Sequence, residues 1–391
     1  MTPDAGTWVI LFAGVIAGYA YVGYPVLLWL LGLARPRRLK PGPPDPWPTV
    51  SVTIPVYNER GSICSVLERA LKFDYPRDRI QILVISDSST DGTDDIVREF
   101  SVQGVELIRL PKRGGKTAAE NAALPHLRGE IIVNTDASIR IPADALKKML
   151  VWFGDPSVGV VSGRDISVTN VGDDANVAES GYVGYEMWIR QLETKVDGII
   201  GASGCFYAIR RYLHEELVPE ALSRDFAAPL VARERGYRSV SAHEAVCFVP
   251  RTPSLEKEYQ RKVRTMTRGL ETLFYKRRLL NPFRYAWFAW MLWSHKVIRW
   301  LVPWALAGVV MASALIFLGG GAGWWRWLVV GELVLGTAGV LGWRWARLAE
   351  TVPLLRAPAY VVAGLTASLH AWIKALQGEL NPLWEPTRRE G

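Results

Sequence analysis

Hydrophobic positions follow two different patterns along this chain. At both ends they form long runs, and in the middle they form short runs separated by charged residues. Residues 8–34 carry no charged side chain, and about 20 apolar residues are enough to cross a bilayer. Basic residues at 35–40 follow this run and none precedes it, so the positive-inside rule places the next segment in the cytoplasm. We therefore predict a retained transmembrane helix at 8–34 rather than a cleaved signal peptide.

The C-terminal part of the chain is apolar again. The pattern predicts two to three transmembrane helices within 299–378, because the stretch 353–376 is interrupted by charged residues and fits a span less well. Residues 283–298 are short and aromatic, which favours a helix lying in the membrane interface. Residues 379–391 are predicted to form a tail.

The middle of the chain alternates short β-branched runs with helical stretches. A basic, proline-rich linker at 35–48 separates it from the first span. The short runs are apolar throughout, which is typical of strands buried on both faces of a parallel sheet. Strands are predicted at 49–55, 80–86, 105–110 and 130–135, with helices at 60–72, 92–101 and 116–126. This order predicts an α/β, doubly wound, Rossmann-like domain over 49–280, with its ligand beyond the carboxyl ends of the strands.

The segments that follow the four predicted strands carry groups suited to a nucleotide. They are Tyr57 with Glu59, the run DSSTDG from Asp87, the loop PKRGGKT at 111–117, and Asp136 with Ser138. An aromatic ring, carboxylates and a cationic glycine loop are what a base, a ribose, a diphosphate and a divalent metal require. The loop lacks the first glycine of a P-loop, and no GxGxxG follows a strand, which disfavours dinucleotide binding.

The amino-acid composition disfavours several further classes of protein. The 391 residues are 49% hydrophobic with a formal net charge of +8, and the three cysteines include no CxxC pair. A disulfide scaffold and a zinc ribbon are therefore disfavoured. The basic run at 276–278 adjoins the apolar C-terminal part, so we interpret it as a contact with the inner leaflet and expect no nucleic-acid partner.

An ordered series of motifs resembles the family-2 glycosyltransferases of the cellulose-synthase and hyaluronan-synthase branch, which have a GT-A nucleotide-sugar fold. The series is SVTIPVYNER (51–60), SDSSTDGT (86–93), KRGGKTAAENAA (112–123), NTDAS (134–138) and GIIGASGCFYAIRR (198–211). It continues through SRDFAAPLVARERGYRS (223–239) and EYQRKVRTMTRG (258–269), so the resemblance covers nearly the whole chain.

The resemblance implies a role for each matched position. Pro55, Tyr57 and Glu59 would flank the uracil, Asp87 would contact the nucleoside, and Lys116 would lie near the diphosphate. Asp136, with Ser138 at the second position of the metal motif, would hold Mg²⁺ or Mn²⁺. The GASG segment, with Gly201, Ser203 and Gly204, would lie near the acceptor, and Asp225 would be the catalytic base. Arg261 and Arg264 occupy the basic positions of the last motif and would bind the donor.

Three positions depart from the family pattern. Ser138 stands in place of a metal-binding aspartate, Arg224 in place of the glutamate before the catalytic aspartate, and Thr265 in place of a tryptophan that stacks on the acceptor. Two features outside the motifs were also interpreted from sequence alone. Glu186 and Arg190 lie four residues apart, which is typical of an exposed ion pair, and His295 with Lys296 is expected to touch either lipid headgroups or a glycan.

The sequence therefore predicts an inverting membrane hexosyltransferase of the EC 2.4 class, which moves sugar from a UDP-sugar to a growing glycan or glycolipid. Its catalytic domain would face the cytoplasm at a plasma membrane or bacterial inner membrane. Two alternatives stay open: transfer of one sugar to a polyprenyl-phosphate or diacylglycerol lipid, and a catalytically weak nucleotide-sugar-binding subunit. Because so few spans cannot enclose a wide channel, export of product would require a second copy or an accessory membrane subunit.

Overall fold

The computed structural model describes residues 5–34, 39–168, 177–216, 218–250, 255–320, 323–345 and 351–379. Within them, one seven-stranded sheet has the order β3-β2-β1-β4-β6-β5-β7. Its strands are β1 Val50–Val56, β2 Ile80–Ser86, β3 Val105–Arg109, β4 Ile131–Thr135, β5 Val158–Val168, β6 Phe206–Arg210 and β7 Arg238–Pro250. The α/β fold class predicted from the sequence is confirmed.

The first four strands form the parallel half of the sheet. β1 pairs in parallel with β2 on one side and with β4 on the other, and β3 lies outside β2. Strands β2 and β3 are thus added on one side of β1, and β4 is added on its other side. This reversal of strand order between β1 and β4 is where an open α/β sheet forms a crevice for its ligand. Pro55 is buried near the end of β1, beyond the last residue that pairs with β4, so its missing N–H leaves no β4 carbonyl unpaired.

Beyond the four predicted strands the sheet is mixed, because β6 joins it in the opposite direction. This strand runs antiparallel to both β4 and β5, and Thr135 at the end of β4 pairs with Phe206 at the start of β6. The GASG segment at 201–204 immediately precedes β6. The antiparallel register therefore places this segment beside Asp136, although the two are far apart in sequence.

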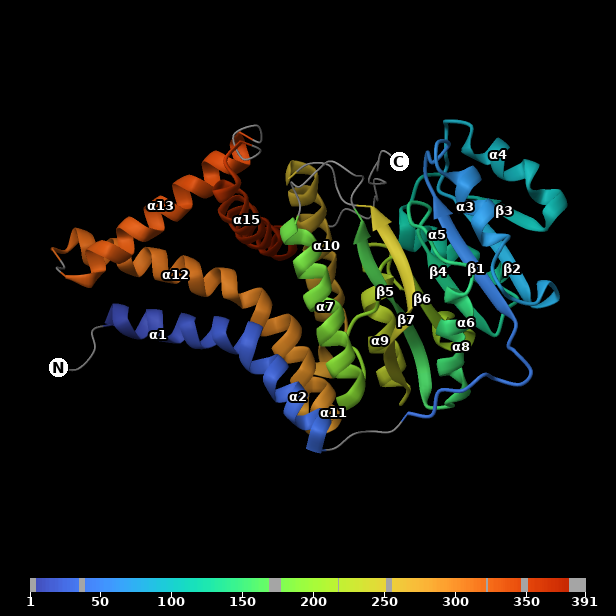
Figure 1. Cartoon of the computed structure of the whole chain (residues 1–391), viewed down its shortest axis with the longest axis horizontal. Coiled ribbons are helices and arrows are strands. Elements are labelled where there is room, and N and C mark those ends of the chain that lie inside the picture. Colours follow the sequence, from blue (N-terminus) through green and yellow to red (C-terminus); the bar gives the residue numbers. More distant parts are fainter. Residues whose placement is uncertain are drawn as a thin grey trace.

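Helices cover both faces of the sheet. The structure has helices in the three segments where the sequence predicted them, namely α3 Ile63–Ala70, α4 Thr93–Glu99 and α5 Lys116–Ala123. Further helices are α6 Ala145–Leu150, α7 Val177–Val196, α8 Arg211–His214, α9 Arg224–Glu234 and α10 Leu255–Tyr275. In Figure 1, α7 and α10 stand between the sheet and the apolar helices.

Four described helical stretches are long and apolar enough to cross a membrane. The first, Ala5–Ala34, contains α1 Ala5–Gly18 and α2 Tyr24–Ala34, and the second, Pro282–Leu318, contains α11 Pro282–Leu292 and α12 Arg299–Leu318. The others are Trp324–Arg344 (α13) and Pro353–Gln377, which contains α15 Arg356–Gln377. Residues 283–298 thus continue into α12 within one long stretch. Their predicted place in the interface remains a prediction, as does the number of C-terminal spans.

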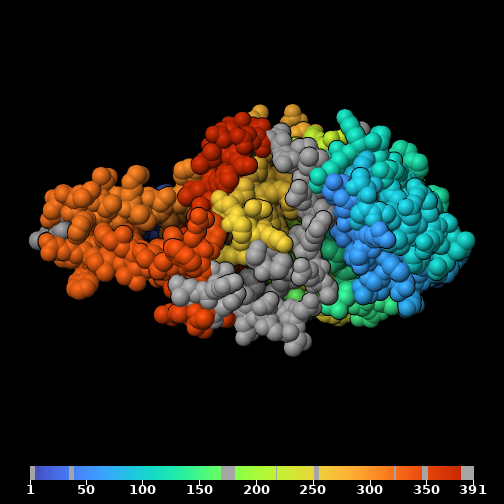
Figure 2. Space-filling model, turned by 90° about the horizontal axis from the view of Figure 1, so that it is seen from above, coloured from blue at the N-terminus to red at the C-terminus, as the bar shows by residue number. Residues whose placement is uncertain are grey.

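The apolar helices extend away from the sheet as one arm. α1 packs along α12, while α15 packs against both α13 and α10 (Figure 1). Seen from above in Figure 2, the yellow part of the chain lies between the orange-to-red C-terminal helices and the blue-to-cyan parallel half of the sheet. The helix that carries the last basic motif is therefore held between the membrane-type helices and the sheet.

Candidate active site

The loop after β3 is fastened to the end of β2 by Asp87. The carboxylate of Asp87 is buried and accepts hydrogen bonds from the backbone N–H groups of Gly114 (2.7 Å) and Gly115 (2.8 Å). Gly115 has a φ of 88°, a conformation that glycine adopts without strain, and it directly precedes α5. Asp87 thus fixes the loop that presents Lys116 at the start of α5.

Lys116 is held by contacts with two different segments of the chain. Its Nζ lies 2.5 Å from Asp136 Oδ1 and donates to the carbonyl oxygen of Gly204 at 2.7 Å. Burial alone would lower the pKa of Lys116, but the carboxylates of Asp136 and Glu120 raise it above its ordinary value. The ammonium group is therefore a permanent positive charge between the end of β4 and the GASG segment.

Asp225 lies on the other side of the same segment. It belongs to the first turn of α9, and its Oδ1 accepts a hydrogen bond from Ser223 Oγ at 2.5 Å. A methyl group added at Gly204 would lie 3.0 Å from Asp225 Oδ2, so the carboxylate rests against this glycine. Gly204 thus contacts Lys116 through its carbonyl and Asp225 through its Cα.

The other predicted residues of the acceptor segment have different surroundings. Ser203 is buried, and its hydroxyl donates to Asp165 Oδ1 (2.6 Å) while accepting from the backbone N–H of Cys205 (3.0 Å). The Ser203 side chain therefore shapes the turn from inside. Gly201 packs against Phe226, the residue after Asp225: a methyl group at Gly201 would lie 3.3 Å from the phenyl ring.

The residues expected around the base lie at the end of β1. The Arg113 guanidinium carbon lies 3.9 Å from the centroid of the Tyr57 ring, so a side chain of the glycine loop at 111–117 covers this aromatic ring. Glu59 accepts a hydrogen bond from Ser62 Oγ at 2.6 Å, and its backbone N–H donates to Thr93 Oγ1. Arg113 belongs to the predicted glycine loop, but its stacking on Tyr57 was not predicted from sequence.

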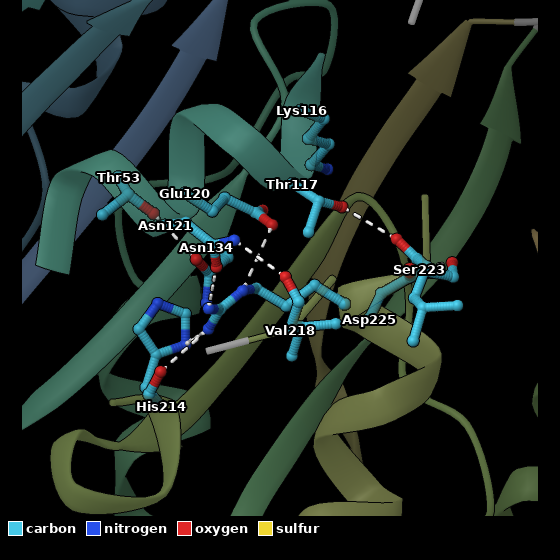
Figure 3. A network of polar contacts seen from close by, with 12 residues as sticks. Thr53, Lys116, Thr117, Glu120, Asn121, Asn134, His214, Val218, Ser223 and Asp225 are labelled. Carbon is cyan, nitrogen blue, oxygen red and sulfur yellow. Dashed lines mark hydrogen bonds and ion pairs between the residues drawn. The ribbon is translucent and has the colours of Figure 1, made fainter. Parts of the chain in front are cut away.

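Arg224 is buried in a polar network with Glu120, Asn121 and His214, three residues that Figure 3 labels. It donates to Asn121 Oδ1 and to the backbone oxygen of His214, and its Nε lies 3.9 Å from Glu120 Oε2. Burial raises the pKa of Glu120, although Lys116 and Arg224 act in the opposite direction. Burial and the Arg224 charge hold the pKa of His214 well below its ordinary value, so this imidazole is neutral at pH 7.

The basic residues of α10 divide between two places. Arg261 forms a two-bond ion pair with Glu258 on its own helix, at 2.7 and 2.8 Å, and Arg264 lies one turn further along α10. Arg268, which the sequence analysis did not single out, donates to Thr117 Oγ1 at 2.7 Å and to the backbone oxygen of Leu222. Burial lowers the pKa of Arg268, whereas the nearby Asp225 and Glu120 carboxylates raise it. The spacing of four residues from Arg264 was the sequence signal for this third cation.

The metal-binding capacity of the site depends on one carboxylate. No group of three or more His, Cys, Asp or Glu side chains capable of holding a metal occurs among the described residues. Asp136 keeps Oδ2 beyond its contact with Lys116, and Ser138 lies two residues further on. Mg²⁺-type ions commonly take one or two protein carboxylates and complete their shell with phosphate oxygens and water. The donor set therefore fits an ion that binds together with a diphosphate.

The mixed α/β sheet is that of a GT-A fold, and comparisons with known proteins show which proteins the chain resembles. Residues 51–218 match the family described as glycosyl transferase family 2. Over its matched region, the chain is 28% identical to a β-monoglucosyldiacylglycerol synthase from Nostoc sp. across 182 residues, covering 46% of this chain and 39% of that protein. It is 33% identical to a cellulose synthase catalytic subunit from Pseudomonas fluorescens across 165 residues, covering 40% and 22%.

One solved structure resembles nearly the whole chain. It is a mannosyltransferase from Pyrobaculum calidifontis in complex with GDP-Man and Mn²⁺, with a TM-score of 0.72 and 25% identity, covering 95% of this chain and 99% of that one. The segment 51–218 therefore resembles a family-2 glycosyltransferase domain, and the structural resemblance extends to the apolar helices. The curated relatives are matched over less than half of their own lengths.

Proposed function

We propose that this protein is an inverting membrane glycosyltransferase that moves a sugar from a nucleoside diphosphate donor to a glycan or glycolipid acceptor. The observation that carries the proposal is the convergence of Lys116, Asp136 and Asp225 on the GASG segment. A UDP-sugar is the donor expected from the resemblance, and the GDP-Man in the similar archaeal structure makes a GDP-sugar the second donor to test.

The proposed proton acceptor, the Asp225 carboxylate, is separate from the two cations, Lys116 and Arg268, and the reaction requires both kinds of group. The acceptor hydroxyl passes its proton to Asp225 as its oxygen forms a bond to the anomeric carbon. The bond between that carbon and the diphosphate oxygen breaks, and the nucleoside diphosphate leaves with the electron pair. Lys116 stabilises the charge that develops on the leaving group, and the buried guanidinium of Arg268 adds to the same field. Attack from the face opposite the leaving group inverts the anomeric centre, so an α-linked donor gives a β-linked product.

Asp136, with Ser138 as an additional oxygen, is the residue proposed to hold Mg²⁺ or Mn²⁺. When bound, the metal neutralises charge on the diphosphate oxygens. Tyr57 and Glu59, with Pro55 behind them in β1, are proposed to position the nucleobase. Asp87 fixes the glycine loop against the nucleoside side of the crevice.

The acceptor and the membrane side belong to the same proposal. The catalytic domain is proposed to face the cytoplasm, with the acceptor approaching along the membrane. Addition of a single sugar to a lipid is the second candidate, because Thr265 lacks the stacking ring of the family and one relative is named as a glycolipid synthase. The binding-subunit alternative is disfavoured because Asp225 and Lys116 are both in place.

The test is nucleotide release by the purified full-length protein with UDP-sugars and GDP-Man, in the presence of membrane lipid extract. We expect one donor to be consumed, and we expect EDTA to lower the rate by at least about a hundredfold, since one metal supplies several kcal/mol of charge stabilisation. Mn²⁺ or Mg²⁺ should restore the rate, whereas Ca²⁺ serves as a mismatched control. Nucleotide binding without release from any donor would contradict the proposed activity, and full activity in EDTA would contradict the metal.

Gly204→Ala tests whether the acceptor segment and the base form one unit. The added methyl group would lie 3.0 Å from Asp225 Oδ2 and must displace the carboxylate by a few tenths of an ångström. We expect kcat to fall by about tenfold with little change in donor affinity, because the misplacement affects only the attacking step. Gly42→Ala is the matched control, since a methyl group there meets no atom within 4 Å. Equal kcat values for the two variants would show that the contact between Gly204 and the Asp225 carboxylate does not position the proposed base.

A further inference from the structure

A cluster of charged side chains joins the sheet domain to the second candidate span. We call it the junction cluster: Glu186, Arg190 and Glu193 of α7, with His295 and Lys296 in the π-helical segment before α12 and Arg299 at the start of α12. The two nitrogens of His295 lie 2.7 Å from Glu193 Oε1 and 3.0 Å from Glu186 Oε2, and Arg299 also binds Glu186. The prediction of an ion pair between Glu186 and Arg190 is wrong. The Glu186 carboxylate instead binds His295 and Arg299, which lie in the second candidate span.

The junction cluster carries more positive than negative charge. Even before His295 is counted, three basic side chains, those of Arg190, Lys296 and Arg299, face the two carboxylates of Glu186 and Glu193. Burial alone would raise the pKa of Glu186, but His295 and Arg299 hold it well below its ordinary value, so this carboxylate is already ionised. Nε and Nη2 of Arg299 are buried without a hydrogen-bond partner among the described residues. A buried surplus cation normally requires an anion.

Among the described residues, Lys296 and Arg190 are the two cations of the cluster that form no ion pair with a carboxylate, but Arg190 donates hydrogen bonds to Ser162 Oγ and to the Ala202 carbonyl. Lys296 Nζ lies 5.4 Å from the ring centroid of Phe226 and 5.9 Å from that of Trp300, within the range of cation–π contacts. The described residues supply it with no hydrogen-bond acceptor and no ion-pair partner. The residue is partly buried.

The position of Lys296 connects it to the acceptor segment. A methyl group at Gly201 would lie 3.9 Å from Lys296 Cε and 3.3 Å from the Phe226 ring, and Phe226 directly follows Asp225. On the same side, Arg190 donates to the Ala202 carbonyl at a long 3.3 Å. Trp300 packs on Gly269 of α10, one turn beyond Thr265, so α12 places a tryptophan near the position where the family has one.

We propose that Lys296 binds a phosphate group carried by the lipid acceptor, with Phe226 and Trp300 forming the apolar side of this subsite. The inference rests on the proposed function and selects a phosphate-bearing lipid over an uncharged one. An acceptor that enters along α12 meets Lys296 before it reaches Asp225, so the phosphate fixes the distance of the reacting hydroxyl from the base. A neutral diacylglycerol has no group to match the surplus charge.

The test measures binding rather than turnover, so it does not depend on finding the natural acceptor. Farnesyl phosphate and farnesol are titrated separately into the full-length protein in neutral-lipid nanodiscs. We expect the wild type to bind farnesyl phosphate at least about tenfold more tightly than farnesol, as one charge-assisted hydrogen bond in a partly buried site provides. In Lys296→Met this preference should disappear, while Lys296→Arg should keep it.

Controls separate phosphate recognition from general effects. Arg284→Met removes an exposed cation from the same helical stretch, next to a tyrosine ring as Lys296 is next to aromatic rings, and should leave the preference unchanged. Retained UDP or GDP binding in Lys296→Met shows that the variant is folded. An unchanged preference in Lys296→Met, an equal loss for farnesol, or no preference in the wild type would each overturn the proposal. Displacement of farnesyl phosphate by an equal concentration of inorganic phosphate would overturn the lipid assignment. Failure of nucleotide release concerns only the proposed activity.

Discussion

Replacing Asp225 by asparagine is expected to lower kcat by about a thousandfold while changing donor affinity by less than about threefold. A positioned general base contributes roughly 10²–10⁴-fold to a transfer of this kind, and the amide cannot accept the proton. The backbone geometry should be kept, because the side chain contacts Ser223 Oγ and Gly204 and asparagine has the same shape. The measurement is steady-state nucleotide release with the donor and metal found active for the wild type.

The control for this variant is Asp95→Asn. Asp95 also lies in the first turn of a helix, but it is exposed and its described ion pair is with Arg98 on α4. Its substitution should leave kcat within about twofold of the wild type, since an exposed pair of this kind contributes little. If Asp225→Asn retained more than a tenth of the wild-type kcat, Asp225 would not be the base, and the attacking hydroxyl would have to be deprotonated elsewhere.

Restoring the family glutamate at position 224 is expected to destabilise this protein by about 3–5 kcal/mol. Arg224 is buried with Glu120, and replacing it by glutamate would place a second carboxylate in the same polar network and leave Glu120 with only one of its two neighbouring cations, Lys116. The hydrogen bonds to Asn121 and to the His214 carbonyl would be lost as well. Thermal unfolding in detergent, followed by size-exclusion chromatography of the heated sample, should show a lower midpoint for Arg224→Glu.

Two further variants make this result specific. Lys148→Glu reverses a charge in an exposed ion pair with Asp144 and should shift the midpoint only slightly. The double variant Arg224→Gln with Glu120→Gln removes both buried charges, so it should recover much of the stability lost in Arg224→Glu, because the two sites are coupled. An unfolding midpoint equal to that of the wild type in Arg224→Glu would mean that Glu120 does not depend on Arg224.

The departure at position 224 has a structural explanation in this chain. Sequence comparison showed only that an arginine replaces an acidic residue next to the proposed base. The structure shows that the guanidinium of this arginine lies in a buried site with Glu120, Asn121 and His214. The change therefore alters the support behind α9 and leaves the carboxylate of Asp225 in the crevice, which agrees with a catalytic rather than a binding-only protein.

The sequence by itself determined the parallel half of the sheet and the residues at its carboxyl edge. Strands such as β1 and β2 were predictable because an unbroken apolar run between polar turns has a local signature. The carboxyl ends of neighbouring parallel strands lie at the same edge of the sheet. The sequence therefore predicts that Asp87, Lys116 and Asp136 lie near one another. The apolar helices at both ends were predictable for the same reason, because length and hydropathy are local properties.

Only the tertiary structure decided which distant residues meet. The antiparallel register of β6 against β4 brings Gly204 to Lys116, which is 88 residues away in sequence. Glu186 bonds to Arg299, 113 residues away, and not to Arg190, which lies four residues away. Arg268 reaches the site because α10 packs across it. These contacts depend on register and packing between elements, and neither the spacing nor the type of the residues encodes them locally.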